Sequence, residues 1–155
     1  MTQNAQEQGL QTLEIKRRVE VAAPIDVVFE SVLEQLGPLN EEPDGSAMPM
    51  RLEAWPGGRW FRDFGEKGGH WWGSVQSIRQ PDLLEIHGPM FMSAPVVSHI
   101  LFRLKEENGV TLIDFSHRAV GLIPEMFLDG KEINTGWGNY LSKVTALAEK
   151  RSTKR

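Results

Sequence analysis

His117 is the side chain in this sequence best suited to acid–base chemistry. It follows Ile113 and Phe115 on one face of a run with the alternating pattern of a strand. Imidazole titrates near neutral pH, so an inward-facing histidine could hydrogen-bond a ligand or move a proton. It could equally be a semi-buried histidine whose hydrogen bonds are all made within the protein.

Arg62 is a candidate for binding an acidic group. In the stretch RWFRDF it shares a strand face with Trp60 and Phe64. If that face is concave, the guanidinium lies at a cavity wall and could bind a carboxylate or phenolate. A register shifted by one residue would place Arg59 and Asp63 there instead.

Several other chemistries lack the residues that they need. The histidines His70, His87 and His99 have no metal-ligand spacing, and cysteine is absent, so we expect no metal and no cofactor. The serine-nucleophile motifs GxSxG and SxxK do not occur, and no catalytic residue is assigned. The chain carries 17 Lys and Arg against 21 Asp and Glu, with a net charge of −4, which argues against nucleic-acid binding.

The composition also suggests where the protein works. Absence of cysteine fits a reducing compartment, and no run of about 18 apolar residues predicts membrane insertion. The N-terminal residues are polar and lack the apolar core of a signal peptide. We therefore expect a cytoplasmic protein with a disordered tail at 1–11, one domain at 12–151 and a short tail at 152–155.

The elements that must position these side chains follow from periodicity. A strand is predicted at Leu13–Val21, a helix at Ile25–Gly37, and a polar loop with one helical turn at Pro38–Pro49. The chain closes with a long helix within Pro124–Arg151. Six further strands with short connections are predicted between them, at Met50–Trp55, Arg59–Phe64, His70–Arg79, Leu83–His87, Val97–Lys105 and Val110–Ala119. This order predicts an α+β fold with an antiparallel sheet.

The sequence Pro56-Gly57-Gly58 could be a phosphate-binding loop or a turn. A phosphate loop leads into a helix, whereas an alternating strand pattern follows here, so a hairpin turn is predicted. Four of the five tryptophans lie around this turn and in the following strands, as core residues or as the lining of a cavity: Trp55, Trp60, Trp71 and Trp72.

Two apolar loops and two glycines invite further hypotheses. The segments GPMFMSAP and Met126-Phe127-Leu128 could close over a ligand entrance, cover the ends of the core or contact a second copy. Gly136 and Gly138 cost about 1 kcal/mol each in a helix, so we expect close approach to a strand or room beside a cavity. Acidic residues fall in predicted loops or turns and are expected at the solvated surface: Glu41, Glu42, Asp44, Glu106 and Glu107.

Taken in order, four of these features resemble the SRPBCC (START/Bet v 1-like) superfamily, within it the branch named for the activator of Hsp90 ATPase homologue. They are Ala23-Pro24, Pro56–Trp60, Thr111–His117 and Gly136–Gly138, and the resemblance covers about Leu13–Lys150. It implies a helix-grip fold, in which a curved antiparallel sheet of about seven strands wraps around the C-terminal helix and leaves an apolar cavity. The family often carries a tryptophan-containing segment after the first helix, where this chain has NEEPDGSAMP.

The resemblance implies a cavity that binds a small apolar or amphipathic molecule. A cyclase or dehydratase in which His117 or Tyr140 moves a proton is an alternative. So is an interaction module with a chaperone partner, and a homodimer is compatible with each. The residues expected to bind the ligand are Trp60, Arg62, Phe64, Phe102, Phe115, His117, Trp137, Tyr140, Leu141 and Val144.

Overall fold

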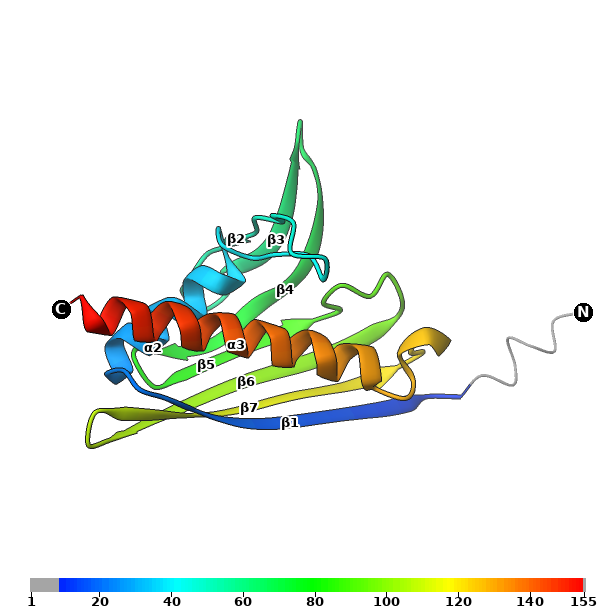
Figure 1. Cartoon of the computed structure of the whole chain (residues 1–155). Coiled ribbons are helices and arrows are strands. Elements are labelled where there is room, and N and C mark those ends of the chain that lie inside the picture. The colour runs from blue at the N-terminus through cyan, green and yellow to red at the C-terminus, as the bar shows by residue number, and fades with distance from the viewer. Residues whose placement is uncertain (1–8, 155) are drawn as a thin grey trace, which may run out of the picture.

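The computed structural model describes residues 9–154, so most of the predicted N-terminal tail lies outside the described residues. The elements follow one another in the predicted order, a strand, a helix, six strands and a long closing helix, with a short 3-10 helix before the last (Figure 1). The strands are β1 (Gln11–Val21), β2 (Arg51–Leu52), β3 (Arg59–Gly65), β4 (Gly68–Arg79), β5 (Leu83–Gly88), β6 (Val96–Glu107) and β7 (Val110–Gly121). The helices are α2 (Ile25–Leu36), the short 3-10 helix η1 (Glu125–Phe127) and α3 (Lys131–Thr153).

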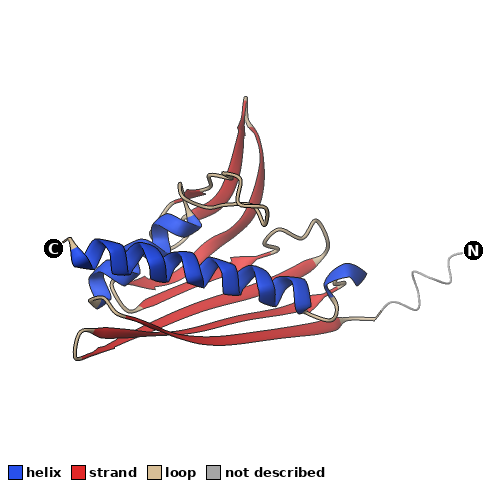
Figure 2. Cartoon of the chain, viewed as in Figure 1, coloured by secondary structure: helices blue, strands red, loops and turns tan. Residues whose placement is uncertain are grey.

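The strands form one antiparallel sheet in the order β1-β7-β6-β5-β4-β3-β2. Consecutive strands from β2 to β7 are neighbours, and the first strand returns to pair with the last along its whole length, from Gln11 opposite Gly121 to Val21 opposite Thr111. The sheet curves, and α3 lies along its concave face (Figure 2). The predicted α+β helix-grip fold is therefore confirmed.

Alternation along the strands decides which side chains the helices cover. In β7, Ile113, Phe115 and His117 are buried, while Asp114 between them and Arg118 after them are exposed. The buried face packs against α3 through Trp137, whose ring centroid lies 4.5 Å from that of Phe115. The core thus sits between the sheet and the two long helices, as a half-buried strand pattern requires.

Two acidic side chains tie the helices to the sheet. The Glu106 carboxylate at the end of β6 accepts a 2.7 Å hydrogen bond from the amide of Ile25, the first residue of α2. Glu149 of α3 accepts one of 2.9 Å from the Ala22 amide. A carboxylate at a helix N-terminus satisfies a free amide and complements the helix dipole. Glu106 thus has a local structural contact beyond the solvated-surface position predicted for it.

Several element boundaries differ from the prediction. The closing helix starts at Lys131 because Glu125–Phe127 form a separate 3-10 helix and Gly130 has a left-handed φ of 73°. Strand β2 is short, with only Arg51–Leu52 paired to β3. The segment 38–49 has no helical turn, whereas at the other end α3 extends through Ser152 and Thr153.

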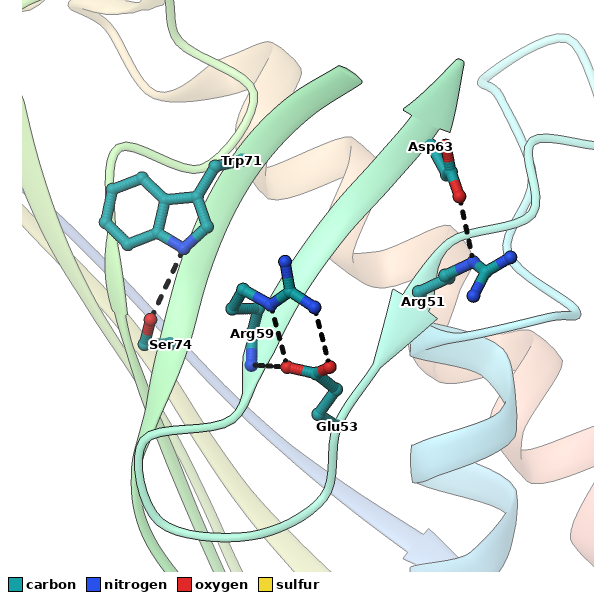
Figure 3. A network of polar contacts seen from close by, with 6 residues as sticks. All are labelled: Arg51, Glu53, Arg59, Asp63, Trp71 and Ser74. Carbon is teal, nitrogen blue, oxygen red and sulfur yellow. Dashed lines mark hydrogen bonds and ion pairs between the residues drawn. The ribbon is translucent and has the colours of Figure 1, made fainter. Parts of the chain in front are cut away.

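The turn Pro56-Gly57-Gly58 joins β2 to β3, as predicted (Figure 3). Gly57 has a φ of 85°, and a Cβ on Gly58 would lie 1.8 Å from the Glu53 carbonyl oxygen, so both positions favour glycine. Across the turn, the Glu53 carboxylate accepts hydrogen bonds from Arg59 Nε (2.9 Å) and Nη2 (2.8 Å). These bonds and one from the Arg59 amide lower the pKa of Glu53 to about 2.

Within residues 9–154, no helix is both long and apolar enough to cross a membrane.

Candidate functional site

A cavity of about 440 Å³ lies between the sheet and the first half of α3. This volume falls within the range of small-molecule sites, roughly 300–1,000 Å³. Its wall is mainly aromatic and methionine side chains from the sheet, from the loop between β5 and β6, from η1 and from α3, with polar residues of the loop after α2 at one side. The lining residues are Leu36, Asn40, Glu41, Glu42, Pro43, Met48, Trp60, Trp72, Met90, Phe91, Met126, Phe127, Glu132, Ile133, Gly136, Trp137 and Tyr140.

A chain of edge-to-face aromatic contacts joins the sheet to η1 along this wall. Ring centroids are 5.1 Å apart for Trp60 and Trp72, 5.9 Å for Trp72 and Phe91, and 5.3 Å for Phe91 and Phe127. Such geometry is the favourable arrangement of aromatic pairs. Because Phe91 and Phe127 belong to the two apolar loops of the sequence, this position favours the entrance-closing hypothesis for those loops.

Trp137 separates His117 from the cavity. Its indole Nε1 donates a 2.9 Å hydrogen bond to His117 Nδ1, and His117 Nε2 lies 2.8 Å from Ser98 Oγ. An indole N–H can only donate, so Nδ1 is the acceptor, and Nε2 carries the proton and donates to Ser98. Burial lowers the pKa of His117 to about 4. Both ring nitrogens are thus occupied within the protein, and the ring is held neutral.

Tyr140 reaches the cavity with its ring but not with a free hydroxyl group. The hydroxyl donates a 2.8 Å hydrogen bond to the Val32 carbonyl of α2. Burial raises the pKa of Tyr140 well above its ordinary value. Its hydroxyl therefore joins the two helices.

The structure brings three of the predicted ligand-binding residues to the cavity wall: Trp60, Trp137 and Tyr140. The other seven predicted residues are not part of it. Five of them are buried in the core beneath or beside the wall: Phe102, Phe115, His117, Leu141 and Val144. These five residues face the core, as their patterns predicted, but they lie outside the cavity wall, so their direct contact with a ligand stays a prediction.

Arg62 and Phe64 also lie away from the cavity. The β3–β4 hairpin projects beyond the region that α3 covers (Figure 1), and Phe64 near its tip is 62% exposed. The Arg62 guanidinium lies 5.3 Å from the centre of the Phe64 ring. Arg62 is half-buried and Phe64 is exposed, because a strand face is buried only as far as a helix covers it, and neither residue is part of the cavity wall.

Sequence reasoning missed several wall residues. Trp72 was noted only as one of a cluster of tryptophans, and it enters the wall at a register shift between β3 and β4, where Trp60 pairs with Gly73 but Phe61 pairs with Trp71. Glu41 and Glu42, expected at the solvated surface, border the cavity together with Glu132. Their polar, aperiodic segment gives no signal for such a position.

The two glycines of α3 have different surroundings. A Cβ on Gly138 would lie 3.0 Å from Arg17 Nη2, whereas a Cβ on Gly136 would meet nothing within 4 Å. Close approach of the Arg17 side chain of β1 therefore accounts for Gly138, and open space beside the cavity for Gly136.

Gly136→Ala should raise the free energy of unfolding by up to about 1 kcal/mol, because it removes a helix-destabilising residue without a clash. Gly138→Ala is the matched control, since displacement of Arg17 from its 2.7 Å hydrogen bond to Asn134 offsets the same gain. Urea unfolding followed by circular dichroism measures both. Destabilisation by Gly136→Ala would contradict the open space at this position.

The outer face of the sheet carries paired charges. Arg118 Nε lies 2.7 Å from the Glu14 carboxylate, and Arg18 Nε lies 2.8 Å from that of Asp114. Both pairs are directly opposite across β1 and β7. Such cross-strand pairs stabilise the sheet weakly and keep this part of the face polar.

The chain thus has a helix-grip fold with an apolar cavity under its C-terminal helix. No protein-family model matches the sequence, and no curated protein matches it. Solved structures do share the fold. A protein of Rhizobium leguminosarum has a TM-score of 0.71 at 16% identity, over 92% of this chain and 97% of its own.

Two further solved structures share the fold. CalU16 from Micromonospora echinospora has a TM-score of 0.60 at 20% identity, over 96% of this chain and 88% of its own. The Aha1 dimer from Colwellia psychrerythraea has a TM-score of 0.60 at 16% identity, over 88% of this chain and 96% of its own. At these sequence identities, the similarity shows a shared fold and nothing more.

Proposed function

We propose that this protein is an SRPBCC-type binding protein that takes a small apolar or amphipathic molecule into the cavity under α3. The observation that carries the proposal is the wall itself, in which Trp60, Trp72, Phe91, Phe127 and Trp137 surround about 440 Å³. Rigid aromatic side chains of this kind suit a ligand with a flat aromatic or an acyl body. The fold shared with CalU16 and the Aha1 dimer is compatible with this function.

Binding is favoured over catalysis by the contacts of the two candidate proton carriers. His117 is engaged on both nitrogens behind Trp137, and the Tyr140 hydroxyl donates to a backbone carbonyl. A general acid or base must lie within hydrogen-bond reach of the reacting group. Neither residue has a free polar atom for that purpose, so a cyclase or dehydratase using them has less support.

The test combines native mass spectrometry with fluorescence. Purified protein is examined for a co-purifying molecule and then titrated with fatty acids, fatty amines, flavonoids and fused-ring aromatics while tryptophan emission is recorded. Because three tryptophans line the cavity, a bound ligand should change this emission.

A matched pair of variants locates the binding. Gly136 lies at helical spacings of three and four from Ile133 and Tyr140, so Gly136→Leu adds a side chain on the cavity side of α3. It should weaken binding about tenfold or more. Thr135→Leu, at the exposed neighbouring position, should bind like the parent. Equal affinity of Gly136→Leu and the parent, or no binding of any compound, would contradict the proposal.

A partner-binding function is the second candidate, and one observation favours it. Three large aromatic residues are exposed around β2–β4, Trp55 (58%), Phe64 (62%) and Trp71 (45%). Exposed aromatic residues are enriched at protein interfaces. Sedimentation of the parent and of a Trp55→Ser, Trp71→Ser variant tests this candidate, because a dimer formed through this surface should dissociate in the variant.

A further inference from the structure

The aromatic side chains of the cavity wall use all of their polar hydrogens within the protein. Trp60 Nε1 donates to the Leu36 carbonyl (2.8 Å), and Trp72 Nε1 donates to His70 Nδ1 (3.0 Å). Trp137 Nε1 donates to His117 and the Tyr140 hydroxyl to the Val32 carbonyl. Each of these groups has one hydrogen to give. The aromatic wall therefore offers a ligand apolar contact but no hydrogen-bond donor.

The charged residues that border the cavity are all acidic, and we refer to them as its acidic side. Glu41 and Glu42 come from the loop after α2, and Glu132 comes from the first turn of α3. No lysine or arginine is among the lining residues. Carboxylates accept hydrogen bonds and attract positive charge, so this side repels an anionic ligand group.

Lys143 lies beside the loop that carries Glu41 and Glu42, and it is already paired. Lys143 Nζ is 2.6 Å from a carboxylate oxygen of Glu41. Glu42 accepts a 2.8 Å hydrogen bond from the Ser46 hydroxyl, which leaves its charge uncompensated. In the part of the chain from 9 to 154, neither Glu42 nor Glu132 forms an ion pair. The acidic side of the cavity therefore retains the charge of these two residues.

We propose that the cavity selects ligands whose polar end is a cation or a hydrogen-bond donor, such as an amine, on an aromatic body. This inference rests on the proposed binding function and specifies its ligand class. The aromatic body occupies the space between Trp60, Trp72 and Trp137, and the amine lies between Glu42 and Glu132. A ligand with a carboxylate or phenolate end finds no free donor on the aromatic side chains of the wall and meets the like charge of the glutamates.

Three probes that share a naphthyl body and differ in the polar end measure how the charge of that end affects binding. They are 2-(1-naphthyl)ethylamine, 2-(1-naphthyl)ethanol and 1-naphthylacetate, each titrated into the full chain by calorimetry at low ionic strength. The amine should bind about tenfold more tightly than the carboxylate, with the alcohol between them. Salt should narrow the difference, since the charges are partly exposed.

Variants that lack the two negative charges then test whether Glu42 and Glu132 cause the preference for the amine. In Glu42→Gln, Glu132→Gln the affinities for amine and carboxylate should agree within about twofold, while binding of the alcohol is retained. Glu66→Gln, at the distant β3–β4 turn, should leave all three affinities unchanged. Thermal unfolding of each variant verifies that the fold is intact.

The outcomes distinguish this inference from the function on which it rests. Equal binding of the three probes, or an amine preference that persists in the double variant, overturns the amine selectivity and leaves a cavity for neutral ligands. If none of the three probes binds and no compound of the fluorescence panel changes the tryptophan emission, the binding function is overturned as well.

Discussion

Replacement of Trp60 by alanine should lower the free energy of unfolding by about 3–5 kcal/mol, as is usual when a buried aromatic residue is truncated. The side chain is only 2% exposed and packs edge-to-face against Trp72. Its indole also donates to the carbonyl of Leu36, the last residue of α2, so the substitution removes the hydrogen bond between sheet and helix. Urea unfolding followed by far-UV circular dichroism measures the loss.

Two matched variants separate the contributions. Trp60→Phe keeps an aromatic ring but leaves the buried Leu36 carbonyl without this donor, which should cost about 1–3 kcal/mol. Trp71→Ala removes a tryptophan that is 45% exposed on the adjacent strand, and it should cost clearly less than Trp60→Ala. Similar losses for Trp60→Ala and Trp71→Ala would show that burial at the wall does not control stability.

Acid should destabilise this protein through His117. Burial lowers the pKa of this side chain from an ordinary 6.5 to about 4. Between these values the unfolded chain binds more protons than the folded one, so stability falls as the pH falls and is fully present only above about 6.5. Between pH 7 and pH 4.5 the loss from this residue should be about 2 kcal/mol, most of it below pH 6.

The variant His117→Gln provides the comparison, because glutamine does not titrate in this range. It should be less stable than the parent at pH 7, since the hydrogen bonds to Trp137 and Ser98 are altered. Its loss between pH 7 and pH 4.5 should be smaller than that of the parent by about 2 kcal/mol. Parallel pH profiles for the two proteins would contradict a neutral buried imidazole.

Much of the fold follows from local pattern. Alternation in Val110–Gly121 and three- and four-residue spacing in Ile25–Leu36 reflect one-sided burial, which is the property that sequence periodicity records. The turn at Pro56-Gly57-Gly58 was predictable because only glycine fits its backbone. The same reasoning placed Trp60, Trp137 and Tyr140 on inward faces.

The periodicity of a sequence shows which side chains face inward, but it does not show how deeply each of them is buried. His117 and Trp137 both point inward, yet one lies behind the other, and only the three-dimensional packing decides which of them borders a cavity. Arg62 lies outside the cavity wall for a related reason, because the length by which a hairpin projects beyond a helix depends on the whole sheet (Figure 1). Glu42 lies in an aperiodic loop, whose position no periodicity could have indicated.

The pairing of β1 with β7 has a consequence for the order of events during synthesis. Strand β1 is made before β7, and within residues 9–154 it pairs with β7 alone, so it has no partner in the sheet until Val110–Gly121 has left the ribosome. Contacts so distant in sequence form slowly because a long loop must close. The charged side chains that alternate along β1, among them Lys16 and Arg18, then protect an unpaired strand from association with other chains during that interval.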